Sequence, residues 1–177
     1  MALVIHEKTA GAPPDKAALL EALYRRAGPI AHGLALAITG DPAAAEDVVH
    51  EAVVRVAEKL STLQDAAALD GYLVRTARNL ALDLQKRSHA GERAQRAAAV
   101  ALLRRKRGGS GELDVERLGR ALFALPPEQR EVVVLRVWEG WTAAQVSERL
   151  AIPAGTVHSR YRLALERLRG LLLEGRP

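Results

Sequence analysis

The sequence predicts an all-α protein made of two small helical domains that a basic linker joins. Hydrophobic residues make up 49% of the chain and aromatic residues only 3%, and Ala and Leu, which are abundant, are strong helix formers. Apolar residues recur at three- and four-residue steps, as in amphipathic helices. Residues 85–112 carry eight basic and two acidic side chains. The expected parts are a flexible tail over 1–15, a helical domain over 16–87, a basic linker over 88–112 and a helix-turn-helix domain over 113–177.

The N-terminal domain is predicted to begin with two amphipathic helices. Residues 15–40 are apolar at helical spacing, and Gly28–Pro29 is expected to break or kink that helix. Asp41 is a favourable N-cap for the next helix, with Pro42 at its first helical position. The buried stripe of this second helix is expected to consist of Val49, Val53, Val56 and Leu60.

A third helix is predicted to complete this domain, with an apolar side and a polar side. The apolar side is expected to consist of Leu69, Leu73, Ala77, Leu80 and Leu84. The polar side is expected to consist of Arg75, Arg78, Asn79, Asp83 and Lys86.

The linker is marked by its charge and by its glycines. The basic stretch over 85–112 runs QKRSHAGERAQRAAAVALLRRKRGGSGE and has GGSG before its last residue, which is typical of a flexible chain, although RAQRAAAVALLRR is able to form a short helix. Its positive charge favours a polyanionic partner, and a solvated linker is the alternative. Its 28 residues reach about 90 Å when fully extended. The linker therefore allows the domains to separate, and they are free to pack together when the protein is alone.

The C-terminal domain contains residues that start and stop helices. Pro126–Pro127 is expected to end one helix and begin the next, and Gly140 is expected to end that one. Thr142 and Gln145 have the spacing of a capping box, so another helix is predicted to begin there. The segment AIPAG then predicts a tight turn before a final helix.

The last two helices have the spacing of a helix-turn-helix, in which the second helix enters the DNA major groove. The buried stripe of that helix is expected to consist of Val157, Tyr161, Ala164, Leu165, Leu168 and Leu172. Its outward face is expected to consist of Thr156, His158, Ser159, Arg162, Glu166 and Arg169. Arginine pairs with guanine edges or phosphates, serine and threonine with phosphates, and histidine with either. A helical hairpin with an ordinary charged face is the alternative.

These segments resemble two regions of a known family. ALPPEQREVVVLRVWEGWTAAQVSERLAIPAGTVHSRYRLALERLRGLL resembles region 4 of the extracytoplasmic-function (ECF) sigma factors of the sigma-70 family. GDPAAAEDVVHEAVVRV and YLVRTARNLALDLQKR resemble region 2, and the regions follow in the family's order. In that family, region 2 binds the polymerase clamp and melts and reads the promoter −10 element. Region 4 reads the −35 element and binds the polymerase flap. One departure is Ala151, where the family usually has glycine.

The resemblance implies three sets of site residues and several partners. The implied −35 readers are Thr156, His158, Ser159, Arg160 and Arg162. The implied −10 contacts are Tyr72, Arg75, Arg78, Asn79 and Lys86. The implied polymerase-binding residues are Asp47, His50, Glu51 and Arg55. The implied partners are core RNA polymerase, through its clamp and flap, promoter DNA and an anti-sigma factor.

Two other functions stay open at this point. Family members often have aromatic residues where this chain has Val53 and Ala57, and Trp where it has Tyr72. Stacking on an aromatic ring contributes roughly 1–3 kcal/mol per base. A sigma-derived protein-interaction module without promoter melting is therefore one alternative. A stand-alone helix-turn-helix regulator is the other.

Enzymatic, metal and membrane functions are not expected. The chain has no cysteine, which excludes disulfides, thiol catalysis and cysteine-based zinc sites. Glu46 and Asp47 near His50 give half of a carboxylate–histidine metal site, and the second half is missing. No phosphate loop or nucleophile–base pair is present, so no catalytic residue and no cofactor are expected. No apolar run approaches the ~20 residues of a membrane span, and a cytoplasmic protein is expected.

Overall fold

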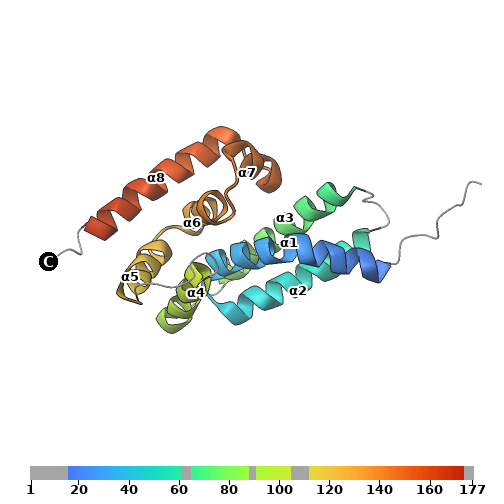
Figure 1. Ribbon diagram of the computed structural model, residues 1–177, viewed down its shortest axis with the longest axis horizontal. Helices are drawn as coiled ribbons and strands as arrows, with labels where there is room; N and C mark the ends of the chain where they lie inside the picture. Colours follow the sequence, from blue (N-terminus) through green and yellow to red (C-terminus); the bar gives the residue numbers. More distant parts are fainter. Residues whose placement is uncertain (1–15, 61–64, 88–90, 105–111, 174–177) are drawn as a thin grey trace, which may run out of the picture.

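The computed structural model describes residues 16–60, 65–87, 91–104 and 112–173, and every element in this part of the chain is a helix. The expected all-α fold is confirmed. The expected tail over 1–15 lies outside the described residues. Helices α1 (Lys16–Thr39), α2 (Pro42–Lys59) and α3 (Ala66–Arg87) pack side by side as an N-terminal unit (Figure 1).

Local capping rules account for where α2 begins. The carboxylate of Asp41 accepts hydrogen bonds from the amides of Ala43 at 2.9 Å and Ala44 at 3.5 Å. These amides belong to the first turn, which has no acceptor within the helix. Pro42 occupies the first helical position, where its missing N–H costs no hydrogen bond. The predicted start of this helix is therefore confirmed.

The break expected at Gly28–Pro29 does not occur, and α1 continues through Pro29. Proline removes one hydrogen bond from a helix and strains the preceding turn. Packing offsets this cost, because the second half of α1 is buried almost completely between α2 and α3. Gly28 is also buried, and the ring of Tyr24 lies about where a side chain on Gly28 would stand, at 3.0 Å from its Cβ position.

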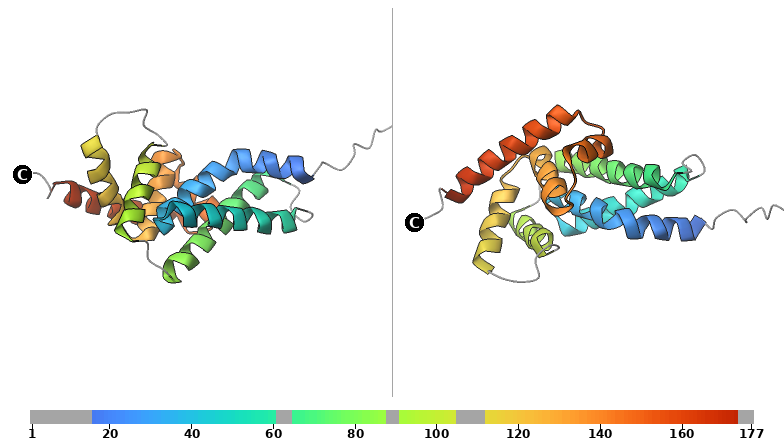
Figure 2. Two further views of the ribbon diagram at one scale, coloured as in Figure 1. Left: turned by 90° about the horizontal axis from the view of Figure 1, so that it is seen from below. Right: turned by 45° about the horizontal axis from the view of Figure 1, so that its top comes forward.

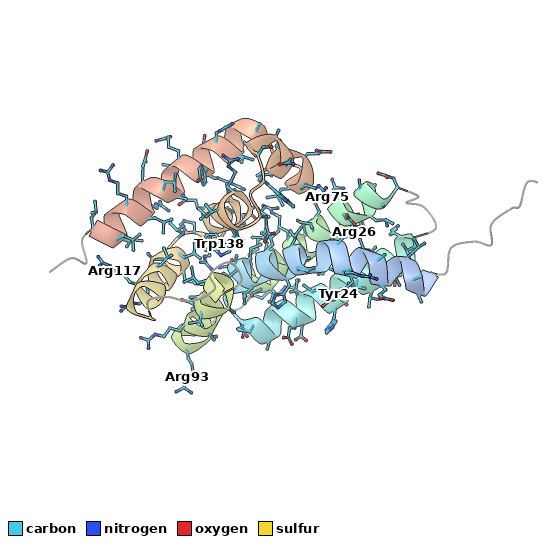
Figure 3. All side chains as sticks on the ribbon, in the orientation of Figure 1. Tyr24, Arg26, Arg75, Arg93, Arg117 and Trp138 are labelled. Carbon is cyan, nitrogen blue, oxygen red and sulfur yellow. The ribbon has the colours of Figure 1, made fainter. Side chains whose placement is uncertain are left out.

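The predicted linker contains helix α4 (Glu92–Arg104), which packs against α5 (Glu112–Phe123). The two helices approach closely at Gly119, where an added Cβ would lie 2.5 Å from the Cβ of Ala99. The indole Nε1 of Trp138 donates a hydrogen bond to the carbonyl of Leu102 near the end of α4, at 2.9 Å. Figure 3 shows Trp138 on the side of the C-terminal helices that faces α4. The short helix predicted as a possibility inside the linker is thus present and is anchored to later parts of the chain.

The remaining helices form a C-terminal unit together with α5. They are α6 (Pro127–Val133), the π-helical turn η1 (Val134–Trp138), α7 (Ala143–Leu150) and α8 (Ala154–Leu173). Both halves of the predicted capping box are made: the amide of Gln145 donates to the Thr142 hydroxyl, and the Gln145 side chain accepts from the Thr142 amide. Ala151 has φ 53° and ψ 46°, so the turn between α7 and α8 keeps the left-handed conformation that usually favours glycine.

The buried stripe of α8 is shorter than the sequence predicts. Val157, Ala164 and Leu168 are buried, but Leu165 is 44% exposed. Leu165 is wrongly placed by the prediction because it lies at the edge of the stripe, about 80° around the helix from Val157. The helix covers α6 and α5 along one side only, and the Arg117 guanidinium of α5 donates to the carbonyl of Leu172 near its end (Figure 3).

The two units lie against each other (Figures 1 and 2). Helix α6 packs on α1, and α7 packs on α3. Gly40, at the end of α1 with φ +69°, lets the side chains of Gln95 and Phe123 approach, since both lie 3.2 Å from its Cβ position. Buried side chains of both units join in one hydrophobic core.

We expect Gly119→Ala to destabilise the protein. Alanine gains about 1 kcal/mol of helix propensity over glycine, but the new methyl group overlaps Ala99, and overpacking costs roughly 1–3 kcal/mol. The matched control is Gly170→Ala in α8, where nothing lies within 4 Å and a higher melting temperature is expected. Adding Ala99→Gly to Gly119→Ala should recover part of the lost stability. Thermal unfolding measures all three, and equal stability of the two alanine variants would contradict the close approach of α4 and α5.

Candidate nucleic-acid interface and the contacts between the two units

The N-terminal part of α8 presents a polar face to solvent. His158, Ser159 and Arg162 are exposed there, within about one helical turn of each other. The Arg162 guanidinium pairs with Glu166 at 2.7 Å on the surface, and the Ser159 hydroxyl donates to the carbonyl of Gly155 at 2.9 Å. These three residues belong to the outward face predicted from the sequence, of which Thr156 is half-buried, and their side chains are accessible to a partner.

The turn before α8 is fixed by hydrogen bonds rather than by glycine. The Ser147 hydroxyl of α7 donates to the carbonyl of Ile152 at 2.7 Å, and the amide of Ile152 donates to the carbonyl of Ser147 at 3.2 Å. These contacts hold Ala151 in its left-handed conformation and set the angle at which α8 leaves α7. The exposed face of α8 is therefore held on a rigid support.

Arg160 and Thr156 differ from their neighbours in being half-buried. The Arg160 guanidinium donates to the Oε1 atom of Glu131 at 3.1 Å, and its side chain is 27% exposed. Arg160, one of the implied −35 readers, is thus engaged within the protein in this arrangement. A helix turns by about 100° per residue, so Arg160 points inward where Ser159 points outward.

Glu131 accepts a second guanidinium from the other unit. Arg78 of α3 donates from Nε at 2.6 Å and from Nη2 at 2.7 Å, a bidentate contact between residues 53 positions apart. The Arg78 side chain is 11% exposed and that of Glu131 is 0% exposed. We name Glu131, Arg78 and Arg160 the Glu131 cluster. The sequence places Arg78 on the exposed polar side of α3, but its side chain is bound to Glu131 and largely buried.

Burial and the two arginines act on Glu131 in opposite directions. Burial raises the pKa of the Glu131 carboxyl, because the charged form loses water, while the hydrogen bonds and charge of Arg78, and then the charge of Arg160, act to lower it. The three short charge-assisted contacts require the ionised carboxylate. Sequence reasoning missed Glu131, although a charged residue at the head of the apolar run VVVL was a visible sign of a buried polar contact.

Arg130, next to Glu131, makes a second polar contact between the units. Its Nη1 atom donates to the carbonyl of Ala37 in the last turn of α1 at 2.6 Å. Its Nη2 atom donates to the carbonyls of Phe123 at 3.1 Å and Leu125 at 2.9 Å, and its guanidinium stacks on the Phe123 ring at 4.2 Å. Burial lowers the pKa of Arg130 to about 10, while the charge of Glu128 acts to raise it. Arg130 therefore caps a helix of the other unit at the cost of burying a charge.

The residues predicted to contact the −10 element are divided by this packing. Asn79 and Lys86 are exposed, whereas Tyr72 and Arg75 are half-buried, and Arg75 projects from α3 on the side where α7 lies (Figure 3). The Arg149 side chain of α7 lies 3.7 Å from the Cβ position of Gly71, just before Tyr72.

Arg149 also stacks on Trp141, with its guanidinium carbon 5.6 Å from the ring centroid. Helix α7 thus covers the part of α3 that begins at Gly71. The candidate −10 residues are therefore unequally accessible while α7 packs on α3.

The predicted polymerase-binding residues lie together on α2. Asp47, His50, Glu51 and Arg55 are all exposed, and Arg55 pairs with Glu51 at 2.8 Å. Helix α2 lies on the side of the N-terminal unit that faces away from α7 and α8 (Figure 1). This surface is accessible while the two units are packed together.

The described residues give no support for a metal site or for a membrane-spanning helix. Within them, no group of three or more His, Cys, Asp or Glu side chains is arranged to hold a metal ion. The helices among these residues are too short or too polar to cross a bilayer.

Comparison with known proteins assigns both units. Residues 23–90 match the family pattern described as Sigma-70 region 2, and residues 116–168 match the pattern described as Sigma-70, region 4. The chain is 32% identical over 172 residues to the ECF RNA polymerase sigma factor SigL of Mycobacterium tuberculosis, covering 94% of this chain and 96% of that one. It is 31% identical over 134 residues to the RNA polymerase sigma-E factor of Streptomyces coelicolor, covering 73% and 72% of the two chains.

A solved structure has the same fold. The sigma factor RpoE from Bartonella quintana, crystallised with the anti-sigma factor NepR, superimposes with a TM-score of 0.61 at 23% identity, covering 91% of this chain and 98% of that one. The similarity to sigma factors thus extends over both units and the segment between them. Because a stand-alone helix-turn-helix regulator has no need of the N-terminal unit, that alternative is disfavoured. The chain belongs to the ECF sigma factors of the sigma-70 family, the subunits that bind core RNA polymerase and direct it to promoter DNA.

Proposed function

We propose that the −35 element is read by the exposed N-terminal face of α8, through His158, Ser159 and Arg162. The observation that supports this most directly is their shared exposure at the start of a helix held by a fixed turn. In a helix-turn-helix this end enters the major groove. Arg162 is the best base-edge candidate, because its long side chain is exposed and held only by a surface ion pair, which is worth at most about 1 kcal/mol.

We propose a supporting role for the two half-buried residues of that set. Thr156 lies in the first turn of α8 and is placed for a phosphate, with the helix N-terminus adding its attraction for anions. Arg160 is bound to Glu131, so we propose that it fixes the rotation of α8 about its axis. Loss of the Arg160 side chain is then expected to lower the stability of the protein more than it changes the −35 sequence preference.

The −10 element is proposed to contact α3 through Tyr72, Arg75, Arg78, Asn79 and Lys86. The exposure of Asn79 and Lys86 supports this directly. Arg78, Tyr72 and Arg75 are proposed to reach DNA only after the two units separate. Aromatic side chains remain scarce in this unit, with Tyr24 and Tyr72 its aromatic residues between 16 and 87. Melting is therefore proposed to depend on few stacking contacts.

The remaining proposals concern boundaries, partners and location. We propose regions 2 and 4 as domains over 16–87 and 113–177, with 88–112 as a connecting segment that contains α4. An anti-sigma factor is a proposed partner, because the similar Bartonella quintana protein was crystallised with one. The chain is proposed to act by binding alone, without catalysis of its own, in the cytoplasm where polymerase and promoter DNA meet.

Arg162→Ala is expected to relax −35 sequence preference by roughly 1–3 kcal/mol. The matched control is Arg169→Ala, an exposed arginine two turns further along the same helix, which is expected to leave preference unchanged. Binding to matched and scrambled −35 duplexes at several salt concentrations measures the effect. Equal discrimination by Arg162→Ala and the parent protein would reject α8 as the reader of this element.

Reversing charge on α2 with Asp47→Lys and Glu51→Lys together is expected to weaken binding to core polymerase at least tenfold, because exposed charges there face the proposed clamp partner. Glu21→Lys in α1 is the control. Glu21 and Glu51 are both exposed and each pairs with an arginine four residues later. Circular dichroism verifies folding, and titration of labelled protein with core polymerase gives the affinity. A double variant that binds as tightly as the Glu21→Lys control would exclude this surface.

A further inference from the structure

The Glu131 cluster has one negative and two positive side chains, and its two cations come from different units. Arg160 belongs to the same unit as Glu131, through the packing of α8 on α6. Arg78 comes from α3 in the other unit and makes the shorter, bidentate contact. Both cations belong to the residue sets proposed to contact DNA. The Arg78 guanidinium therefore takes part in the contact between the units and also belongs to the proposed DNA-binding surface.

This composition makes the cluster able to open. Removing the cation from an isolated buried ion pair leaves an uncompensated charge, which is strongly unfavourable. When Arg78 leaves, by contrast, Glu131 keeps Arg160 at 3.1 Å, and one negative charge still faces one positive charge. The cluster with both arginines has a net positive charge, and release of Arg78 removes that excess. The C-terminal unit therefore stays electrostatically satisfied without its neighbour.

In the second polar contact between the units, the residue of the C-terminal unit also keeps partners of its own unit after separation. When the units separate, Arg130 loses the carbonyl of Ala37 but keeps those of Phe123 and Leu125 in its own unit. Its Nε atom is buried and has no hydrogen-bond partner among the described residues. Burying a guanidinium with an unpaired N–H is unfavourable, and separation gives that group access to water. Neither polar contact therefore makes docking irreversible.

Docking also covers the surface that DNA needs. With the units packed, Arg78 is 11% exposed and Arg149 of α7 lies over Gly71 beside Tyr72. A phosphate and a carboxylate are alternative acceptors for the same bidentate guanidinium geometry. We propose that Glu131 and DNA phosphate compete for Arg78, so that docking of the two units and DNA binding by α3 exclude one another. This inference rests on the proposed contact of Arg78 with the −10 strand.

The experiment reports the separation of the units directly. The chain has no cysteine, so Ala67→Cys in α3 and Glu148→Cys in α7, both at exposed positions, accept a fluorophore pair without background labelling. These positions lie on helices that pack together, so separation lowers energy transfer. Arg78→Gln is expected to shift the docked-to-open ratio roughly tenfold or more toward open, because it removes charge-assisted hydrogen bonds. Arg78→Lys, which keeps the charge but loses the bidentate geometry, is expected to fall between Arg78→Gln and the parent.

The matched control is Arg26→Gln. Arg26 makes a similar bidentate contact with Asp70, at 3.1 and 2.9 Å, but both residues lie in the N-terminal unit, so transfer is expected to match the parent. The competitor is mixed-sequence single-stranded DNA. It offers phosphates to α3 but no duplex groove to α8, because a helix-turn-helix reads the major groove of a duplex. Adding it is expected to lower transfer in the parent and in Arg26→Gln, with little further change in Arg78→Gln.

The outcomes separate the docking inference from the proposed DNA contact. Arg78→Gln that binds DNA more weakly but keeps the parent's transfer would overturn the inference and leave the DNA role of Arg78 standing. Reduced transfer with higher DNA affinity would show that Arg78 acts in docking alone, because opening then exposes α3 without the loss of a DNA contact, and the proposed competition for Arg78 would be wrong. Parent protein that binds the strand with undiminished transfer would also overturn it. Helix content by circular dichroism confirms that each variant is folded, and Arg78→Lys serves if Arg78→Gln does not fold.

Discussion

The arrangement of this molecule depends on one buried carboxylate. Glu131 is fully excluded from solvent, and a charge in that position is tolerated only when cations and hydrogen-bond donors surround it. Its donors are arginines of α3 and α8, so α3, α6 and α8 must converge for the carboxylate to be satisfied. Apolar contact between the units adds stability without direction, whereas the bidentate geometry of Arg78 fixes how α3 lies across α6.

The same contact divides each DNA-binding helix into an inner and an outer side. On α8, Arg160 faces the protein, while His158, Ser159 and Arg162 face solvent. On α3, Arg78 lies toward the C-terminal unit, while Asn79 and Lys86 remain exposed. Charged side chains on these helices therefore either contact the rest of the protein or face solvent, where DNA can bind. The direction of each side chain, rather than its type, decides between the two roles.

Features set by neighbouring residues were predictable from the sequence. The caps at Asp41 and Thr142 follow from local chemistry, and both are present. A break of the helix at Gly28–Pro29 does not occur, because packing of α1 between α2 and α3 outweighs the local penalty. Local preference is a weak guide where burial is extensive.

Features set by distant residues were not predictable. The partners of Glu131 lie 53 and 29 positions away, and that of Trp138 lies 36 positions away. On α2, Asp47, His50, Glu51 and Arg55 are exposed, and on α8 the predicted outward residues His158, Ser159 and Arg162 are exposed but Thr156 is half-buried. Arg78 follows the polar periodicity of α3, but a helical pattern does not tell solvent from a second unit of the same chain. Only the tertiary fold distinguishes the two.

Helix α4 also limits how far the two DNA-binding helices can move apart. As a helix, its 13 residues span about 20 Å at 1.5 Å per residue, whereas extended they span about 43 Å. The Trp138 contact with the Leu102 carbonyl and the close packing at Gly119 hold α4 folded against the C-terminal unit. While those contacts persist, the tether is short, and the local concentration of one unit around the other stays high. The helix–coil balance of α4 therefore sets the reach between the two DNA-binding helices.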